Sequence, residues 1–343
     1  MNAPAAETIM PLTNNMAVVL AGAVANGAFE AGALEVLAEH GYPITRILGT
    51  SSGALNATLF SRYTLAGDQR AGAAALVTLW RTDATWWRVF RPSLTGIVTL
   101  TGFSTQEGLL SILRKNVQPV PVAAADVELC VVVTALRGRK GDIGGKPATT
   151  HEGVCSFSKK DFASTEGLRT VFEAAAASAS FPGAFAPAKV AALGRCADGG
   201  IVNNTPLKHV IAADVGRVVV IVPSPRVSHE RAPDTIGALA GRVADIVVQE
   251  RLYRDLRAAE KVNARLAALD NLATKLKVSV DELKSAAGLA GMRHVDVVEI
   301  RPSEAPPNSF AGFFCSSTRE KLIQQGRAAA RAALAPKEVA TAA

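Results

Sequence analysis

The fold is decided by one stretch of sequence, ITRILGTSSGA at positions 44–54. Ile44 to Leu48 is a short apolar run of the kind that forms a buried strand, and Ala54 to Tyr63 has the spacing of a helix. Between them, Gly49-Thr50-Ser51-Ser52-Gly53 has the G-x-S-x-G pattern of a nucleophile elbow, a sharp strand-to-helix turn that exposes a serine hydroxyl. A plain turn is the alternative, but the strand and the helix on either side favour a nucleophile at Ser51.

The segments on both sides of this unit continue the alternation of strand and helix. Met16 to Ala21 is predicted to be a buried strand, and Gly27 to His40 a helix with apolar residues at helical spacing. Further strands are expected at Val127 to Ala135, Arg217 to Val222 and Val295 to Ile300. Further helices are expected at Thr165 to Ser178, at Thr235 to about Leu269, and after capping-box pairs at Ser104/Glu107, Ser279/Glu282 and Ser317/Glu320. This alternation is typical of an α/β fold with a mainly parallel sheet.

The chain of 343 residues shows no internal repeat and no obvious linker. We therefore predict one α/β domain over residues 16–335, with a helical elaboration at 235–290. Residues 1–15 are expected to form a flexible leader and residues 336–343 a flexible tail.

Composition excludes several classes of protein. Hydrophobic residues make up 49% of the chain and charged residues 20%, as in globular proteins. The four cysteines lack the spacing of a zinc site or a disulfide framework, so a reducing compartment and a cytoplasmic location are expected; they are Cys130, Cys155, Cys196 and Cys315. No run of about 18 apolar residues predicts a membrane span, and the N-terminus lacks the pattern of a signal peptide.

The net charge of +7 is spread thinly along the sequence. No basic cluster with interleaved aromatic residues is present, so nucleic-acid binding is not expected. A weak attraction to an anionic membrane surface is more plausible.

A nucleophilic serine needs a base and an oxyanion hole. A conventional triad esterase would use a downstream histidine and an HGGG-type loop. The sequence has no HGGG, and its downstream histidines lack a convincing setting; they are His151, His209, His229 and His294. The triad esterase is therefore kept only as an alternative.

Three further blocks complete a different pattern around GTSSGA. A glycine-containing loop, GAVANG at 22–27, opens a GAFEAGAL helix, ASASFPGAF occupies 177–185, and DGGIVNNTP occupies 198–206. In these four blocks, taken in order and spacing, the sequence resembles the patatin-like phospholipase family over roughly residues 16–225. The resemblance implies a three-layer α/β/α fold with an added C-terminal helical region.

The resemblance also implies the chemistry of a lipid acyl hydrolase with a Ser-Asp dyad and an acyl-enzyme intermediate. Ser51 matches the family's nucleophile and Asp198 its base, and no metal or cofactor is implied. The oxyanion hole would come from backbone N–H groups of Gly22, Ala23, Val24, Ala25, Asn26 and Gly27. The motif glycines would be Gly49, Gly53, Gly199 and Gly200. Neither the lipid head group nor the oligomeric state follows from the sequence.

The glycine-rich loop departs from the family pattern GGGxRG. Ala23 and Val24 replace two glycines, and Asn26 replaces the arginine. A β-branched residue is disfavoured at positive φ, so Val24 predicts a reshaped loop. A non-catalytic or regulatory lipid-binding protein is therefore a second hypothesis.

Two other segments carry residues with a possible role at the site. Residues 80–91 hold all three tryptophans and three arginines, which suits either a membrane-facing or acyl-pocket rim or, slightly better, core packing with exposed arginines. The helix from Gln249 to Leu269 carries five basic residues, and a solvated face explains them better than a basic cover over the site.

Overall fold

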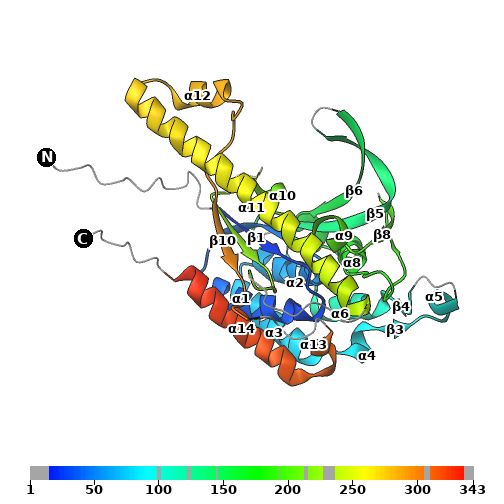
Figure 1. Cartoon of the computed structure of the whole chain (residues 1–343). Coiled ribbons are helices and arrows are strands. Elements are labelled where there is room, and N and C mark those ends of the chain that lie inside the picture. Colours follow the sequence, from blue (N-terminus) through cyan, green and yellow to red (C-terminus); the bar gives the residue numbers. More distant parts are fainter. Residues whose placement is uncertain are drawn as a thin grey trace.

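The computed structural model describes residues 15–98, 102–121, 125–143, 146–191, 193–211, 215–226, 236–304 and 310–335. It is built around an eight-stranded sheet in the order β10-β9-β1-β2-β5-β8-β7, with β6 also paired to β5 (Figure 1). The strands are β1 Met16–Leu20, β2 Ile44–Thr50, β5 Glu128–Ile143, β6 Lys146–Phe157, β7 Ala188–Val190, β8 Gly194–Ala197, β9 Arg217–Ile221 and β10 Asp296–Ile300. The five strands from β10 to β5 are mutually parallel. Strands β6 and β8 each pair antiparallel with β5, and β7 pairs antiparallel with β8.

Helices cover both faces of this sheet, because the side chains of its central strand are apolar in both directions. Along β1, Met16, Val18 and Leu20 enter the larger core, while Ala17 and Val19 enter a second, smaller core on the other face. The larger core packs against α1 Gly27–Glu39, α2 Ser52–Leu65, α3 Gln69–Thr82, α6 Glu107–Asn116, α8 Thr165–Ser178 and α14 Ser316–Leu334. The smaller core includes apolar residues of α10 Lys208–Ile211 and α11 Ile236–Leu276. These are the three layers that the sequence predicted.

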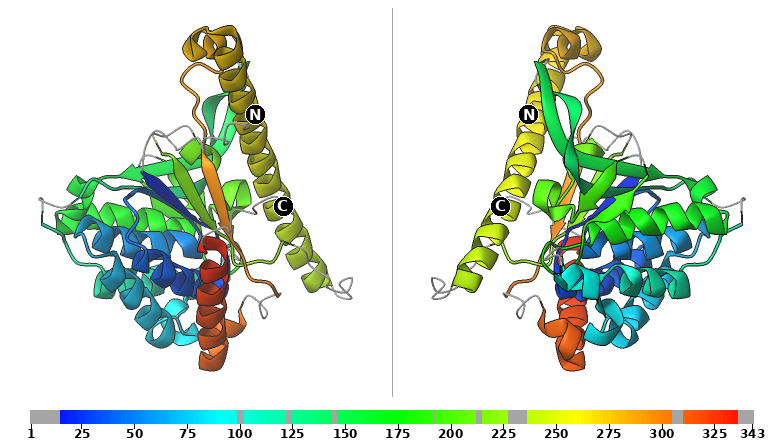
Figure 2. Two further views of the ribbon diagram at one scale, coloured as in Figure 1. Left: turned by 90° about the vertical axis from the view of Figure 1, so that its left-hand side faces the viewer. Right: turned by 90° about the vertical axis from the view of Figure 1, so that its right-hand side faces the viewer.

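The long helix α11 lies along one side of the sheet and extends beyond it to α12 Val280–Ala286 (Figure 2). It covers most of the helical elaboration expected at 235–290. The remaining helices are short: η1 Val24–Asn26, α4 Trp86–Val89, α5 Leu94–Val98, α7 Lys159–Phe162, α9 Gly200–Asn203 and α13 Ala311–Phe314. Strands β3 Arg91–Pro92 and β4 Ser104–Thr105 form a separate two-stranded ribbon that carries α5 at its far end (Figure 1).

Two of the expected capping boxes are wrong. Ser104 lies in β4, where its hydroxyl bonds the backbone of Arg91, and α6 begins after Gln106. Ser317 lies inside α14, and the Glu320 carboxylate accepts two hydrogen bonds from Arg81 of α3. At Ser279 the helix does begin as expected, but the hydroxyl makes no capping hydrogen bond. In the first two cases a partner distant in sequence competes successfully with the local cap.

The leader and tail predicted from the sequence fall almost wholly at positions 1–14 and 336–343, outside the described residues. Within the described residues, none of the helices combines the length and apolar character needed to cross a bilayer. The strand ends that matter for function are the carboxyl ends of β1, β2 and β8, where the sequence blocks singled out above meet.

Candidate active site

Ser51 stands at the turn between β2 and α2, with a backbone φ of 54°. This left-handed conformation is unfavourable for a residue with a side chain, and it is the local strain expected of a nucleophile elbow. The flanking glycines allow the close turn: a Cβ at Gly49 would lie 2.5 Å from the Gly53 carbonyl oxygen, and a Cβ at Gly53 would lie 2.4 Å from the Leu20 carbonyl oxygen. No other residue type fits at either position without a shift of the backbone.

Asp198 follows β8 and lies directly against Ser51. The Ser51 hydroxyl donates to Asp198 Oδ2 at 2.6 Å, and the Gly200 N–H donates to Asp198 Oδ1 at 2.7 Å. Both side chains are buried. Burial raises the pKa of Asp198 to about 6, although the hydrogen bonds from Ser51 and Gly200 act in the opposite direction. Gly199 is required by packing, since a Cβ there would lie 2.1 Å from the Val132 carbonyl oxygen.

The block at 177–185 holds this pair in place. The Ser178 hydroxyl accepts a hydrogen bond from the Ser51 N–H at 2.9 Å and donates to the Val132 carbonyl at 2.5 Å. The carbonyl oxygens of Ser180 and Ser178 accept from the N–H groups of Asp198 and Gly199. The sequence predicted no role for Ser178 itself, because the partners of its hydroxyl lie more than forty residues away in the chain.

The loop at 22–27 faces Ser51 from the end of β1. Asn204 fixes its first residue, since the Gly22 N–H donates to the Asn204 carbonyl and the Asn204 amide donates to the Gly22 carbonyl. A Cβ at Gly22 would lie 2.7 Å from Ser51 Cβ, so the loop passes very close to the serine. Val24 adopts a φ of 54°, the conformation that the sequence marked as difficult for a valine.

The donors in this loop are not equivalent. The Ala23 N–H donates to Ser52 Oγ at 3.0 Å, and the Asn26 N–H donates to the Ala23 carbonyl at 2.9 Å. The Gly27 N–H bonds the carbonyls of Val24 and Ala25. Of the six predicted residues, Val24 and Ala25 are therefore the two whose N–H groups form no hydrogen bond within the described residues.

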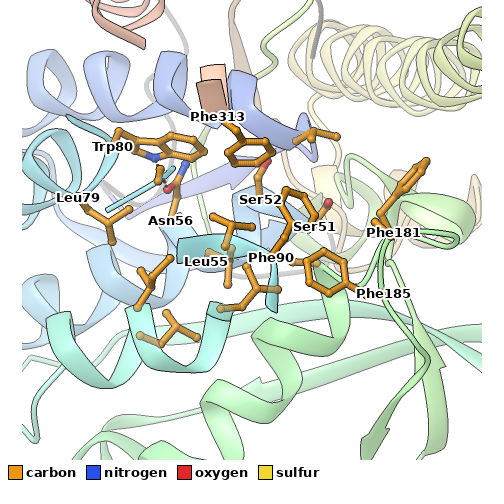
Figure 3. A pocket seen from close by; sticks show the side chains of 18 of the residues that line it. Ser51, Ser52, Leu55, Asn56, Leu79, Trp80, Phe90, Phe181, Phe185 and Phe313 are labelled. Atoms are coloured by element: carbon orange, nitrogen blue, oxygen red, sulfur yellow. Dashed lines mark hydrogen bonds between the residues drawn. The ribbon is translucent and has the colours of Figure 1, made fainter. Parts of the chain in front are cut away.

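Beside Ser51 lies a pocket with almost entirely apolar walls. Leu55, Phe90, Phe185 and Phe313 line its length, and Phe181 lies next to Ser51 (Figure 3). Its other lining residues are Val24, Ser52, Asn56, Leu79, Trp80, Ala84, Val89, Leu109, Ile112, Leu113, Ala179, Ala184 and Phe310. A pocket of this composition suits a hydrocarbon chain better than a polar ligand.

Two polar groups of this pocket, those of Trp80 and Asn56, bond each other at the end opposite Phe181. The Trp80 indole N–H donates to Asn56 Oδ1 at 2.9 Å, as the dashed line in Figure 3 shows. The Asn56 amide donates to the Gly27 carbonyl at 3.0 Å and to Glu30 Oε2 at 2.8 Å. Complete burial raises the pKa of Glu30 well above its ordinary value. Trp80 belongs to the tryptophan segment noted in the sequence, whereas nothing in the local sequence gave Asn56 or Glu30 a role.

A second carboxylate, that of Glu152 on β6, is 10% exposed and meets the segment after Asp198 through Asn203. It accepts hydrogen bonds from Asn203 at 2.7 Å, His209 at 2.8 Å and Lys208 at 2.5 Å, and it forms an ion pair with Arg251 of α11. Burial acts to raise the pKa of Glu152, but the donors outweigh it and lower the pKa to about 2. Nothing in the sequence around Glu152 predicted this cluster, which we call the Glu152 cluster.

The histidines considered for a triad are engaged elsewhere or exposed. His209 Nε2 bonds Glu152, and His151 Nδ1 lies 2.8 Å from the Ala135 carbonyl oxygen. His294 is exposed, just before β10. His229 lies outside the described residues.

The tryptophan segment divides between the two roles that the sequence left open. Trp80 is buried and lines the pocket, whereas Trp87 is 79% exposed. Trp86 lies between them, with its ring against Phe90, Phe103 and Phe314. Among the described residues, no cluster of histidine, cysteine, aspartate or glutamate side chains is arranged to hold a metal ion.

Comparisons with known proteins agree with this architecture. The family described as "Patatin-like phospholipase" matches residues 18–211, which is more than half of the chain. The chain belongs to the patatin-like phospholipase family, as its four sequence blocks indicated.

Among solved structures, the chain is similar to VipD from Legionella pneumophila, with 13% identity and a TM-score of 0.36. The similarity covers 93% of this chain and 67% of VipD. No curated protein matches the chain.

Proposed function

We propose that this protein is a serine hydrolase of lipid acyl esters, with Ser51 as the nucleophile and Asp198 as the base. Family membership supports the general activity on lipids. The single observation that carries the residue assignment is the 2.6 Å hydrogen bond from Ser51 Oγ to Asp198 Oδ2 at the wall of an apolar pocket.

The proposed reaction has two halves. In the first, Ser51 Oγ attacks the ester carbonyl carbon as its proton passes to Asp198, and the tetrahedral intermediate then expels the alcohol, which takes that proton. In the second, Asp198 accepts a proton from water as the water attacks the acyl-enzyme. Collapse of this intermediate releases the fatty acid and returns the proton to Ser51.

The oxyanion of both intermediates is proposed to accept hydrogen bonds from the Val24 and Ala25 N–H groups, the loop donors identified above. Ala23 is excluded from this role while its N–H bonds Ser52. Because backbone donors do not depend on the side chain, alanine and valine can replace the family's glycines here, provided that the backbone keeps its conformation.

The acyl chain of the substrate is proposed to occupy the aromatic pocket, with the alcohol part of the ester on the solvent side of Ser51. A protein of this kind would act in the cytoplasm and at the surface of a membrane. The non-catalytic lipid-binding alternative keeps the pocket but lacks turnover, and the triad alternative requires a histidine to reach Ser51.

These hypotheses are separated by fluorophosphonate labelling and by a panel of p-nitrophenyl and phospholipid esters. We expect wild-type protein to be labelled, and Ser51→Ala to lose labelling and at least about 10³-fold in kcat while keeping its fold. The matched variant Ser52→Ala removes the neighbouring hydroxyl and should still be labelled. An unlabelled wild-type protein would favour the lipid-binding alternative, and unchanged turnover in Ser51→Ala would refute the dyad.

A further inference from the structure

A group of exposed apolar side chains lies on the elements next to the pocket. Trp87 of α4 is 79% exposed, and Leu94 and Val98 of α5 are each 82% exposed. Ile97 of α5, Phe103 and Phe314 add further exposed apolar surface. We call these six residues the apolar rim. Isolated exposed leucines need no explanation, but apolar groups gathered on adjoining elements mark an interaction surface.

The apolar rim is continuous with the wall of the pocket. The centroid of the Trp86 ring lies 4.1 Å from that of Phe90, which lines the pocket. It lies 4.8 Å from the ring centroid of Phe314 and 5.8 Å from that of Phe103, both in the rim. The ribbon that carries α5 is bonded to the pocket wall as well, since the Ser104 N–H donates to the Ala184 carbonyl at 2.9 Å. A ligand held at the rim therefore lies beside the pocket.

Positive charge accompanies these apolar groups. Arg88 and Lys115 share a single carboxylate, that of the buried Asp83, so this group keeps one net positive charge. Arg91 lies in β3, just before α5, and is exposed. In the part of the chain that the structure describes, no carboxylate lies within ion-pair distance of it. Together with the net charge of +7 for the whole chain, these cations favour an anionic partner.

We infer that the apolar rim is the surface by which this protein docks on an anionic lipid bilayer, with α5 and Trp87 inserted among the head groups. The inference rests on the proposed function, because it brings the pocket to the substrate. A lipid surface fits both properties of the rim: hydrocarbon receives the leucine, valine and tryptophan side chains, and anionic head groups pair with the arginines. A second copy of the chain fits less well, because a twofold interface here would bring the same cations together.

The test is co-sedimentation with vesicles of phosphatidylcholine alone and of phosphatidylcholine containing about one fifth phosphatidylglycerol. We expect wild-type protein to prefer the anionic vesicles. The double variant Leu94→Ser/Val98→Ser should lose at least about tenfold in partitioning, since each side chain removes apolar area from the contact. Arg91→Gln should weaken binding to the anionic vesicles by about fivefold at low salt, and less at high salt.

A matched control is available at the end of α11 that adjoins α12, which lies away from α5 (Figure 1); Leu272 and Leu276 of this end are also exposed. Leu272→Ser/Leu276→Ser should bind vesicles like the wild type. All these variants should hydrolyse a soluble short-chain ester at the wild-type rate, because none of the changed residues lines the pocket. Ser51→Ala should still bind vesicles, which separates docking from catalysis.

Wild-type partitioning by Leu94→Ser/Val98→Ser would overturn the inference, as would an equal loss in the α11 control. Equal binding of Arg91→Gln and wild type at low salt would refute the preference for anionic lipid. Light scattering supplies the remaining outcome: if the rim variant turns a dimer into a monomer and keeps its vesicle binding, the rim is a self-association surface and the inference is wrong.

Discussion

Two carboxylates that folding removes from most of their water, Asp198 in the DGG segment and Glu152 on β6, have opposite properties. The pKa of Asp198 is raised to about 6 by burial, and its two hydrogen-bond donors, the Ser51 hydroxyl and the Gly200 N–H, are neutral. Glu152 is also penalised by burial, but hydrogen bonds from His209, Lys208 and Asn203 lower its pKa to about 2. Burial acts in the same direction on both groups, and the donors around each one decide the outcome.

Asp198 can therefore exchange a proton near neutral pH, whereas Glu152 holds the fold together as a permanent charge. A carboxylate with a pKa near 6 is a useful base close to neutral pH, whereas one with a pKa near 2 stays charged throughout. The two sites are joined through Asn203, whose amide bonds Glu152 and whose carbonyl accepts from Thr50, the residue before Ser51. The Glu152 cluster therefore supports the segment that places Asp198.

The largest effect that tests this comparison is expected for Asp198→Asn. An asparagine has nearly the same shape but cannot accept the proton of Ser51, so kcat should fall by about 10²–10⁴-fold in a folded protein. Steady-state kinetics on a soluble ester measures this. His209→Ala should keep at least about a tenth of the activity, because His209 belongs to the Glu152 cluster. If His209→Ala is as damaging as Ser51→Ala, a triad replaces the dyad.

The pH dependence of kcat/KM tests the raised pKa of Asp198, because this ratio reports ionisations of the free enzyme. The reaction needs the ionised carboxylate, so activity should fall as pH drops below about 6. Stability has the opposite dependence: because the folded-state pKa is raised, the contribution of Asp198 is present below about pH 4 and is lost as pH rises through about 6. Urea unfolding of wild type and Asp198→Asn across this range measures it. An acid limb near pH 4 would show that Asp198 is not held in a desolvated site.

Glu152→Gln should lower stability more than activity. It leaves the neighbouring cations without their carboxylate, and we expect a loss of about 1–3 kcal/mol in the free energy of unfolding. The acid limb of kcat/KM should not move. Because the pKa of Glu152 is lowered to about 2, its contribution is present above about pH 4.5 and lost as pH falls toward 2, so the deficit should be equal at pH 8 and pH 5.

The matched control for this variant is Glu128→Gln, which removes a half-exposed partner of Arg46. A pair that keeps this much contact with water contributes little, so the expected loss is below about 1 kcal/mol. Equal stability losses in Glu152→Gln and Glu128→Gln would remove the distinction between an anchoring carboxylate and an ordinary surface pair.

The smallest effect is expected for Val24→Gly, at the second strained residue of the Ser51 region. Glycine relieves about 1–2 kcal/mol of left-handed strain but adds about 1 kcal/mol of backbone entropy to the unfolded state, so the net gain in stability should be below about 1 kcal/mol. The kcat on a short ester should rise, since the donors at 24 and 25 can align more freely. A lower kcat with normal folding would show that the loop is adapted to valine.

The sequence by itself determined the elements whose signals are local. The strand, turn and helix around Ser51 follow from apolar spacing and from two glycines that no other residue can replace. The predicted helix at Thr165 to Ser178 and the predicted strand from Val295 to Ile300 agree with α8 and with β10 to within one residue. Four short blocks in the right order were enough to indicate the family that residues 18–211 match.

Only the tertiary structure decided which groups surround Glu152. The pairing of Ser51 with Asp198, 147 positions apart, was expected from the resemblance to a family, whereas no pattern in the sequence indicated that Glu152 meets Arg251 across 99 positions. The same holds for Glu320, whose pairing with Arg81 across 239 positions replaced the cap that its local sequence predicted. Residue spacing records which face of a helix or strand is apolar, whereas the pKa of a buried acid depends on the charges that folding brings around it.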